Sequence, residues 1–292
     1  MKIDIKRIEF VITHSCTGNC KHCSAVPEYE GSVDAEAAVQ AVKRLTSRYK
    51  VESIMTFGGE PLLYADTVCK IFKAAQNIPK RQIITNGYFS NDEKEIESVA
   101  AAITANDILI SVDAFHQEYI PLEPVIHFAK SLTVRKRVHP AWLINEQDDN
   151  PYNIETKRLL KIFNDMGIES TPHGNNIFPA GRALQFFPPP EKIDLTVPCG
   201  EMPYTGRLDE IECVSIEPNG DLTVCSIPIG NIYKDDVLSI LDNYDPYANP
   251  LTSALLEGGV AKLLEIAGDF DISDCYTACG VCRKIMKGMY KL

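Results

Sequence analysis

The stretch IEFVITHSCTGNCKHC, residues 8–23, sets the expectations for the rest of the chain. An apolar, β-like run opens it, and Cys16, Cys20 and Cys23 follow in the spacing C-x3-C-x2-C. Thiolates this close on one loop converge on a single metal centre. A cubane iron–sulfur cluster normally takes four cysteine ligands, and no fourth cysteine lies nearby in the sequence. The pattern predicts a cluster with one iron open to an exogenous ligand, as a catalytic cluster requires.

A second motif, Gly58-Gly59-Glu60-Pro61, directly follows the apolar run at residues 54–57. Glycines at the end of a strand let the backbone approach a ligand closely. The carboxylate and the neighbouring carbonyls can accept hydrogen bonds from an ammonium group. Taken by itself, the motif also fits a turn that leads into a helix with proline at its first position.

Together the two motifs resemble the signature of the radical S-adenosylmethionine (SAM) enzymes. In that family the open iron of a [4Fe–4S] cluster chelates the amino and carboxylate groups of SAM. One electron then cleaves SAM and releases a 5′-deoxyadenosyl radical, which abstracts a hydrogen atom from the substrate. The resemblance implies that residues 58–61 contact the methionine amino group of SAM. A zinc knuckle or a chance grouping of cysteines would explain the first motif and leave the second unexplained.

The chain from Ile8 to Arg182 alternates short β-branched runs with amphipathic segments. Strands are predicted at residues 8–13, 53–57, 82–85, 108–112, 138–144 and 168–171. Helices are predicted at residues 62–76, 92–104, 124–131 and 154–166, and before them at residues 35–49 with Ser32 as the cap. Six βα units predict an α/β fold with a parallel sheet and right-handed crossovers. The resemblance makes this a partial (β/α)6 TIM-like barrel, whereas periodicity alone does not exclude an open doubly wound sheet.

Polar residues stand at the ends of the predicted strands, where ligands of α/β folds bind. The candidates for contact with SAM or substrate are Asn86, Ser111, Asp113, Asn145 and Arg182. Ser111 and Asp113 have alternate-residue spacing, so both can face the barrel interior and meet ribose hydroxyls or substrate. A helix cap is an equal alternative for Asp113. Residues 179–183 resemble a barrel-closing stretch of the family, in which Arg182 would pair with a carboxylate of SAM or substrate; a surface arginine is the alternative.

Pro188-Pro189-Pro190 is a stiff linker and the predicted boundary between a core of residues 1–187 and a C-terminal domain of residues 188–292. Residues 214–225 are expected to form a β-hairpin around a Pro-Asn-Gly-Asp turn. Gly220, followed by four residues and a cysteine, resembles the SPASM or Twitch auxiliary-cluster domains of the family. A structural zinc site is the alternative.

The C-terminal domain contains six cysteines, too few for two auxiliary four-iron clusters, so one auxiliary [4Fe–4S] cluster is expected. Its predicted ligands are Cys199, Cys225, Cys279 and Cys282. Two substitutions stay open: Cys213 for Cys199, and Cys275 for Cys279. Cys213 is also the candidate hydrogen-atom donor of an epimerase-type reaction, with a silent buried thiol as the alternative.

Composition limits the classes of partner. The 292 residues are 45% hydrophobic and 24% charged, as in soluble globular proteins. A net charge of −11 argues against a nucleic-acid partner held through its phosphates. The sequence has no apolar run long enough to span a membrane and no signal-peptide core at its charged start. Ten cysteines in such a chain favour metal binding over disulfides, and a cytoplasmic location is expected.

The expected function is that of a radical SAM enzyme that modifies a peptide or protein, for example by epimerisation or cross-linking, with flavodoxin or ferredoxin as reductant. The stretch before Cys16 is too short for the small N-terminal peptide-binding domain of many peptide modifiers. A dehydrogenase or modifier of a small molecule or sugar is therefore the alternative. A non-enzymatic iron–sulfur carrier or zinc-stapled scaffold, from another class, explains the cysteines but not the Gly-Gly-Glu-Pro motif.

Overall fold

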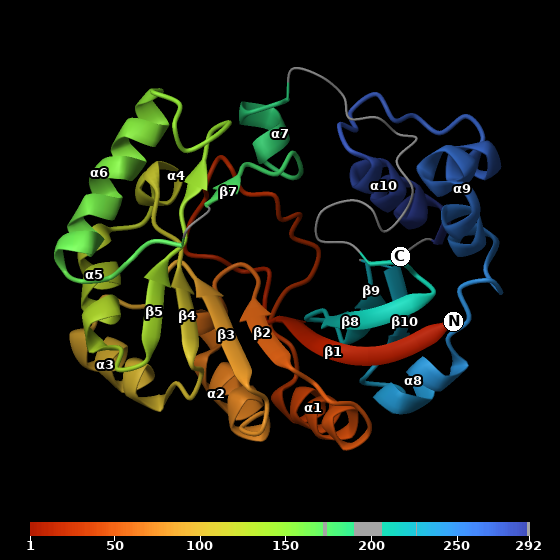
Figure 1. Ribbon diagram of the computed structural model, residues 1–292, viewed down its shortest axis with the longest axis horizontal. Helices are drawn as coiled ribbons and strands as arrows, with labels where there is room; N and C mark the ends of the chain where they lie inside the picture. The colour runs from red at the N-terminus through yellow and green to blue at the C-terminus, as the bar shows by residue number, and fades with distance from the viewer. Residues whose placement is uncertain (172–173, 190–205, 226, 291–292) are drawn as a thin grey trace.

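The computed structural model describes residues 1–171, 174–189, 206–225 and 227–290. A curved sheet crosses the molecule in the strand order β10-β9-β8-β1-β2-β3-β4-β5 (Figure 1). Its strands are β1 (Lys2–Val11), β2 (Ser53–Phe57), β3 (Lys80–Thr85), β4 (Asp107–Ile110), β5 (Arg135–Val138), β8 (Glu210–Ile216), β9 (Asp221–Val224) and β10 (Ile227–Asn231). A separate parallel pair joins β6 (Ala141–Trp142) and β7 (Asn175–Asn176).

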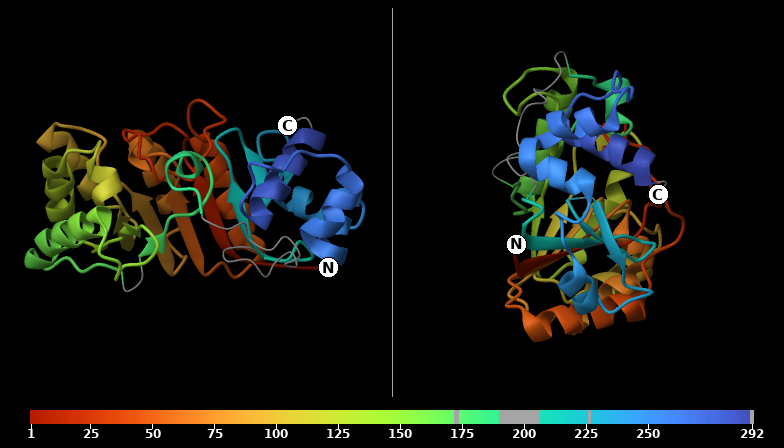
Figure 2. Two further views of the ribbon diagram at one scale, coloured as in Figure 1. Left: turned by 90° about the horizontal axis from the view of Figure 1, so that it is seen from above. Right: turned by 90° about the vertical axis from the view of Figure 1, so that its right-hand side faces the viewer.

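Helices cover both sides of this sheet. They are α1 (Ala35–Arg48), the 3-10 helix η1 (Pro61–Tyr64), α2 (Ala65–Ala74), α3 (Glu93–Ala102), α4 (Ala114–Gln117), α5 (Leu122–Ser131), α6 (Pro151–Asp165), α7 (Ala183–Phe186), α8 (Val237–Asn243), α9 (Pro250–Ala267) and α10 (Ala278–Tyr290). The convex face carries α1, α2, α3 and α8, whereas α9 and α10 lie across the sheet from α1 and α8 (Figures 1 and 2). None of the helices in the described ranges is long and apolar enough to cross a bilayer.

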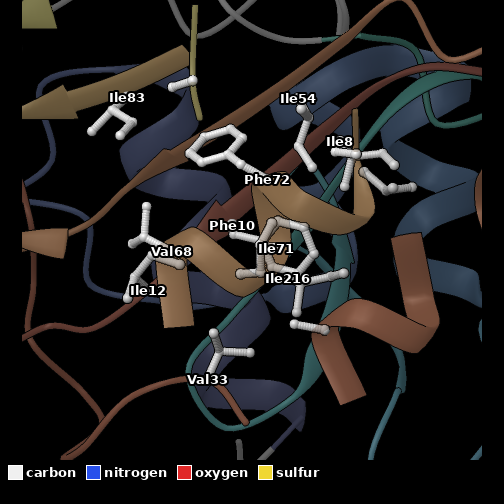
Figure 3. Packing of buried hydrophobic residues seen from close by; sticks show 14 of the residues in the cluster. Ile8, Phe10, Ile12, Val33, Ile54, Val68, Ile71, Phe72, Ile83 and Ile216 are labelled. Atoms are coloured by element: carbon white, nitrogen blue, oxygen red, sulfur yellow. The ribbon is translucent and has the colours of Figure 1, made fainter. Parts of the chain in front are cut away.

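The main core lies between the sheet and the helices of its convex face. Ile8, Phe10 and Ile12 have no exposed surface and alternate along β1 and the residue beyond it, so all three point to this layer. They pack against Phe72 of α2 and Ile216 of β8 in one cluster (Figure 3). Burying a side chain of this size contributes roughly 1.5–3 kcal/mol. The intervening residues of β1 face the concave side, where the site is found.

The predicted elements before residue 132 are present, with shifted ends. The strand at residues 53–57 has the predicted bounds. Helix α1 begins at Ala35, and its cap is Asp34, whose side chain accepts a hydrogen bond from the Ala37 N–H at 2.8 Å. The prediction of Ser32 as the cap was wrong, because Ser32 instead forms an isolated bridge with Thr13.

The fifth and sixth predicted strands are less regular than the pattern suggests. The run at residues 138–144 divides into β5 and β6, with His139 and Pro140 between them. The expected strand at residues 168–171 is reduced to a single parallel bridge between Val138 and Ser170. The parallel part of the sheet therefore stays open at β5.

The C-terminal hairpin joins the core sheet. β8 lies parallel to β1, and Arg7 is in register with Cys213. The predicted hairpin is confirmed: β9 runs antiparallel to β8, and Gly220 has φ +86° in the turn. The cysteine-bearing segment thus extends the sheet of residues 1–187. The predicted domain boundary lies beside residues 190–205, outside the described ranges, and stays a prediction.

Candidate active site and cluster loop

The Gly-Gly-Glu-Pro motif packs against the start of the cluster loop, residues 13–25. Gly59 N–H donates to Thr13 O at 2.7 Å, and Glu60 N–H donates to Ser15 O at 2.8 Å. A Cβ atom at Gly58 would lie 2.4 Å from Thr13 O, and one at Gly59 would lie 2.1 Å from Ser15 O. Both positions thus require glycine, and the close neighbour is the backbone that presents the cysteines.

The side chain of Glu60 is fully buried and connects the ends of β2 and β3. Its carboxylate accepts hydrogen bonds from Thr85 Oγ1 at 2.6 Å, Leu62 N–H at 2.9 Å and Asn86 N–H at 2.8 Å. Burial raises the pKa of Glu60 to about 7, although the three hydrogen bonds oppose that rise. Pro61 begins η1 directly after it, in agreement with the alternative of a turn that leads into a helix.

The three loop cysteines differ in exposure: Cys16 is exposed, Cys23 is partly buried, and Cys20 is buried. Cys16 Sγ accepts hydrogen bonds from Gly18 N–H at 3.4 Å and from Asn86 Nδ2 at 3.6 Å. Burial raises the pKa of Cys20 to about 12. Hydrogen bonds from N–H groups to the cysteine sulfurs, such as those to Cys16, tune an iron–sulfur cluster. The structure places Asn86, a candidate from the sequence, next to the first cysteine.

The spacing of the thiols fits a multi-iron group better than a single zinc ion. Two sulfurs bound to one zinc lie at most about 4.6 Å apart, since each Zn–S bond is about 2.3 Å. In the described part of the chain, one group of three His, Cys, Asp or Glu residues has all its ligand atoms within 4.8 Å of one another, and it does not include these cysteines. Cys16 also lines a cavity of about 370 Å³. The loop thus suits a larger cluster.

The close group consists of His22, Asp113 and His116. Asp113 is fully buried and caps α4, accepting from the N–H groups of Phe115 at 3.0 Å and His116 at 2.9 Å. It also accepts from Ala141 N–H at 2.9 Å and lies 2.8 Å from His116 Nδ1. Because protein donors already occupy this carboxylate, the group forms a hydrogen-bonded network. The helix-cap alternative for Asp113 is thus what the structure shows.

Electrostatics keep Asp113 ionised in this network. Burial would raise the pKa of Asp113, but the adjacent His116 and the hydrogen bonds hold it well below its usual range. The ring of His22 lies 4.6 Å from that of His116 and 4.9 Å from that of Phe115. Burial lowers the pKa of His22 to about 4. His22, which lies between Cys20 and Cys23 in the sequence, is therefore neutral. Its ring contacts with Phe115 and His116 connect the loop to the segment that follows β4.

The structure separates the remaining strand-end candidates. Ser111 directly follows β4, and its N–H donates to Thr85 O at 2.8 Å, beside the end of β3. Asn145 lies in an exposed turn beyond β6, where its Oδ1 accepts from Gln147 N–H at 3.0 Å. Ser111 is thus near the Gly-Gly-Glu-Pro side of the site, whereas the side chain of Asn145 is engaged in its own turn.

Arg182 contacts the cluster loop itself. Its Nε donates to Cys20 O at 3.2 Å, and its Nη1 hydrogen-bonds to Asn19 Oδ1. The next residue, Ala183, donates its N–H to Cys23 O at 3.2 Å. Arg182 also borders the cavity that Cys16 lines. The sequence pointed to a ligand carboxylate as its partner, but the protein partners found are carbonyl oxygens of the loop.

Sequence reasoning missed His14, which joins the cluster loop to the C-terminal hairpin. His14 Nδ1 accepts from the N–H groups of Glu28 at 3.0 Å and Tyr29 at 3.2 Å. Its Nε2 lies 3.4 Å from the carboxylate of Glu217, in the turn between β8 and β9. The available signal was its place two residues before Cys16.

The later cysteines lie in the hairpin and the last helix. Cys213 faces the concave side with Arg7 and Glu9, and burial raises its pKa to about 12. Ser215 pairs with Thr223 in the hairpin, and Cys225 directly follows β9. Cys279 and Cys282 lie on α10. Cys199 lies outside the described residues.

Comparison with known proteins identifies the domain in which the cluster loop and the Gly-Gly-Glu-Pro motif lie. The site combines a mainly parallel sheet with a three-cysteine loop directly after its first strand. Residues 10–143 match the model of the radical SAM superfamily. This segment is a radical SAM domain, and it supports the assignment of a radical SAM enzyme that uses a [4Fe–4S] cluster and SAM.

Several solved structures resemble the chain. anSMEcpe with bound AdoMet is 12% identical, with a TM-score of 0.53 over 82% of this chain and 78% of that one. SuiB of Streptococcus suis bound to the precursor peptide SuiA is 15% identical, with a TM-score of 0.59 over 87% of this chain and 67% of that one. anSMEcpe with AdoMet and the Cp18Cys peptide is 12% identical, with a TM-score of 0.53 over 97% and 88%. These likenesses confirm the expected mixed α/β fold with a parallel sheet, and no curated protein matches the chain.

Proposed function

We propose that the protein modifies a peptide or protein by radical SAM chemistry, with one auxiliary [4Fe–4S] cluster in residues 188–292. The observation that carries the proposal is the pairing of β8 with β1. The strand that leads into the cluster loop is also the neighbour of the cysteine-bearing hairpin. Two of the similar solved structures hold peptides, which supports a peptide substrate. A small molecule or sugar is the alternative substrate.

Cys16, Cys20 and Cys23 would hold the SAM-binding cluster, which when bound supplies one electron for SAM cleavage. Within the protein, Gly18 N–H and the Asn86 amide donate to Cys16 Sγ. Gly58 and Gly59 allow the Gly-Gly-Glu-Pro backbone to brace the loop, and Ser111 lies after β4, hydrogen-bonded to the end of β3. A cytoplasmic flavodoxin or ferredoxin would be the electron donor, in keeping with the cytoplasmic location expected from the sequence.

The auxiliary cluster would be held by Cys225, Cys279 and Cys282 with Cys199, as in SPASM or Twitch domains. Cys225 directly follows β9 and has φ +50°, a conformation that L-residues rarely adopt. This turn takes its thiol out of the strand's regular alternation. Cys213 and Cys275 remain the alternative ligands.

Cys213 is our candidate hydrogen-atom donor to the substrate radical. A donor must carry a thiol hydrogen, and burial keeps Cys213 protonated. Replacing Cys213 with Ala should allow SAM cleavage yet abolish the incorporation of solvent deuterium into the product. Unchanged turnover and unchanged product in D2O would remove the donor role.

The deciding experiment is anaerobic reconstitution with iron and sulfide, followed by dithionite and SAM, with 5′-deoxyadenosine as the readout. The wild type should produce 5′-deoxyadenosine, and a Cys16→Ala/Cys20→Ala/Cys23→Ala variant should not. No product from a protein shown to hold its clusters would refute the proposed chemistry and favour an electron carrier. Candidate peptides encoded beside the gene can then be tested for consumption.

A further inference from the structure

Residues 178–187, here called the strap, cross the cluster loop from a distant part of the sequence. In Figure 1 the strap includes α7 and lies beside the loop that follows β1. Gly181 has φ +56°, and a Cβ atom there would lie 2.6 Å from Ala25 O and 2.9 Å from Cys23 O. The backbones of the strap and the loop are therefore in direct contact just after the third cysteine.

Two donors of the strap reach the carbonyl groups of cluster ligands. Arg182 Nε donates to Cys20 O at 3.2 Å, and Ala183 N–H donates to Cys23 O at 3.2 Å. Arg182 Nη1 adds a bond to Asn19 Oδ1 within the loop. Of the carboxylates in the described ranges, none lies within 4.0 Å of Arg182. Its positive charge is thus directed at the loop.

A fixed positive charge beside an iron–sulfur cluster stabilises the form with one more electron. Net charge and hydrogen bonds around a cluster set its reduction potential, and groups behind the ligands fix their orientation. Arg182 supplies both influences, since it holds the Cys20 carbonyl and carries a charge that no described carboxylate pairs with within 4.0 Å. Its removal should make the cluster harder to reduce.

We propose that Arg182 is a positioning residue that holds the cluster loop and raises the reduction potential of the cluster bound by Cys16, Cys20 and Cys23. The inference rests on the ligand assignment of the proposed function. It gives the strap a task in the reaction, because SAM cleavage begins with reduction of this cluster.

The test is a redox titration of the reconstituted holoenzyme followed by electron paramagnetic resonance, using the signal that changes when SAM is added. That criterion separates this cluster from an auxiliary one, because only an open iron binds SAM. Arg182→Gln should shift the midpoint to more negative potential and speed loss of iron to a chelator. Arg182→Lys, which keeps the charge, should hold a near-wild-type midpoint while losing iron faster. Arg158→Gln, on the outer helix α6, should change neither.

A second variant covers the case in which Arg182→Gln loads no cluster, a result that itself supports the holding role. Gly181→Ala keeps the Arg182 guanidinium but prevents the close approach of the strap to the cluster loop. The midpoint potential of the cluster in this variant should also become more negative. An Arg182→Gln protein with a full cluster and an unchanged midpoint would overturn the inference, as would Arg182→Lys shifted as far as Arg182→Gln. A wild type without any SAM-sensitive signal would instead refute the proposed function.

Discussion

The buried carboxylate of Glu60 makes the stability of this fold depend on pH. Its pKa is raised from 4.5 to about 7, and burial is the main cause. Between these values the folded protein holds a proton that the unfolded chain has released. Folding therefore loses stability as pH rises through this window. The whole contribution is present below about pH 4.5 and is lost above about pH 7.

The size of the effect follows from the two pKa values. A difference of about 2.5 between the folded and unfolded states corresponds to about 3 kcal/mol. Glu60→Gln removes the titration but keeps the shape of the side chain. In this variant the amide NH2 group faces the Asn86 N–H, which donates to the carboxylate in the wild type. This contact lowers the free energy of unfolding by an amount that does not depend on pH. The pH dependence of the difference between the two proteins therefore isolates the carboxylate.

The assay is urea unfolding of the cluster-free protein under reducing conditions, at pH 5 and pH 8. We expect the wild type to lose about 2.5 kcal/mol relative to Glu60→Gln over this range, since pH 5 already lies slightly above the unfolded pKa. Glu93→Gln, which changes an exposed carboxylate in the first turn of α3, is the matched control. A difference that stays flat would show that the three hydrogen bonds keep Glu60 ionised, and the burial argument would then be wrong.

Three further variants test other contacts of the site. Gly59→Ala should lower the free energy of unfolding by at least about 2 kcal/mol and reduce cluster loading, because its Cβ would lie 2.1 Å from a loop carbonyl oxygen. The control Gly206→Ala, where the added Cβ has open space, should change the free energy of unfolding by less than about 0.5 kcal/mol in the same assay. Asp113→Asn should lower the free energy of unfolding by about 2 kcal/mol at pH 7, because it weakens the cap of α4 and the hydrogen bond to His116. Titration below about pH 4 should shrink that deficit, since the Asp113 pKa is depressed; a constant deficit would contradict the assignment. Asn153→Ala should cost about 3 kcal/mol by urea unfolding, since its buried amide makes four hydrogen bonds to one loop, and an unchanged midpoint would contradict this.

Local signals in the sequence predicted the parts of the site that depend on neighbours along the chain. The strand at residues 53–57, the turn at Gly220 and the meeting of strand ends all follow from periodicity and turn chemistry. The cap at Asp34 was missed because a nearby serine was equally suitable by type and was used in a bridge. Which of two similar residues caps a helix thus depends on which of them is already paired with another segment of the chain.

Long-range contacts could not be predicted in the same way. Nothing around Arg182 indicates that its partner is a carbonyl of the cluster loop, and nothing in residues 210–216 indicates parallel pairing with β1. Ile144 is a further case: it has φ +68°, which is unfavourable for a β-branched residue. The loop holds that conformation because the buried Asn153 donates to the carbonyls of residues on both sides of it.

The pairing of β1 with β8 also has a consequence for biosynthesis. β1 is synthesised before the other strands of the sheet, but one of its two neighbours comes from residues 210–216. Until then, the ten-residue strand has an open edge on which another chain can pair, the usual route to aggregation. A fragment that ends at residue 187 would keep that edge permanently. Production of the core alone should therefore give insoluble protein. The cysteine-rich segment thus has a second role, because its strand β8 covers the open edge of β1 and prevents aggregation of the newly made chain.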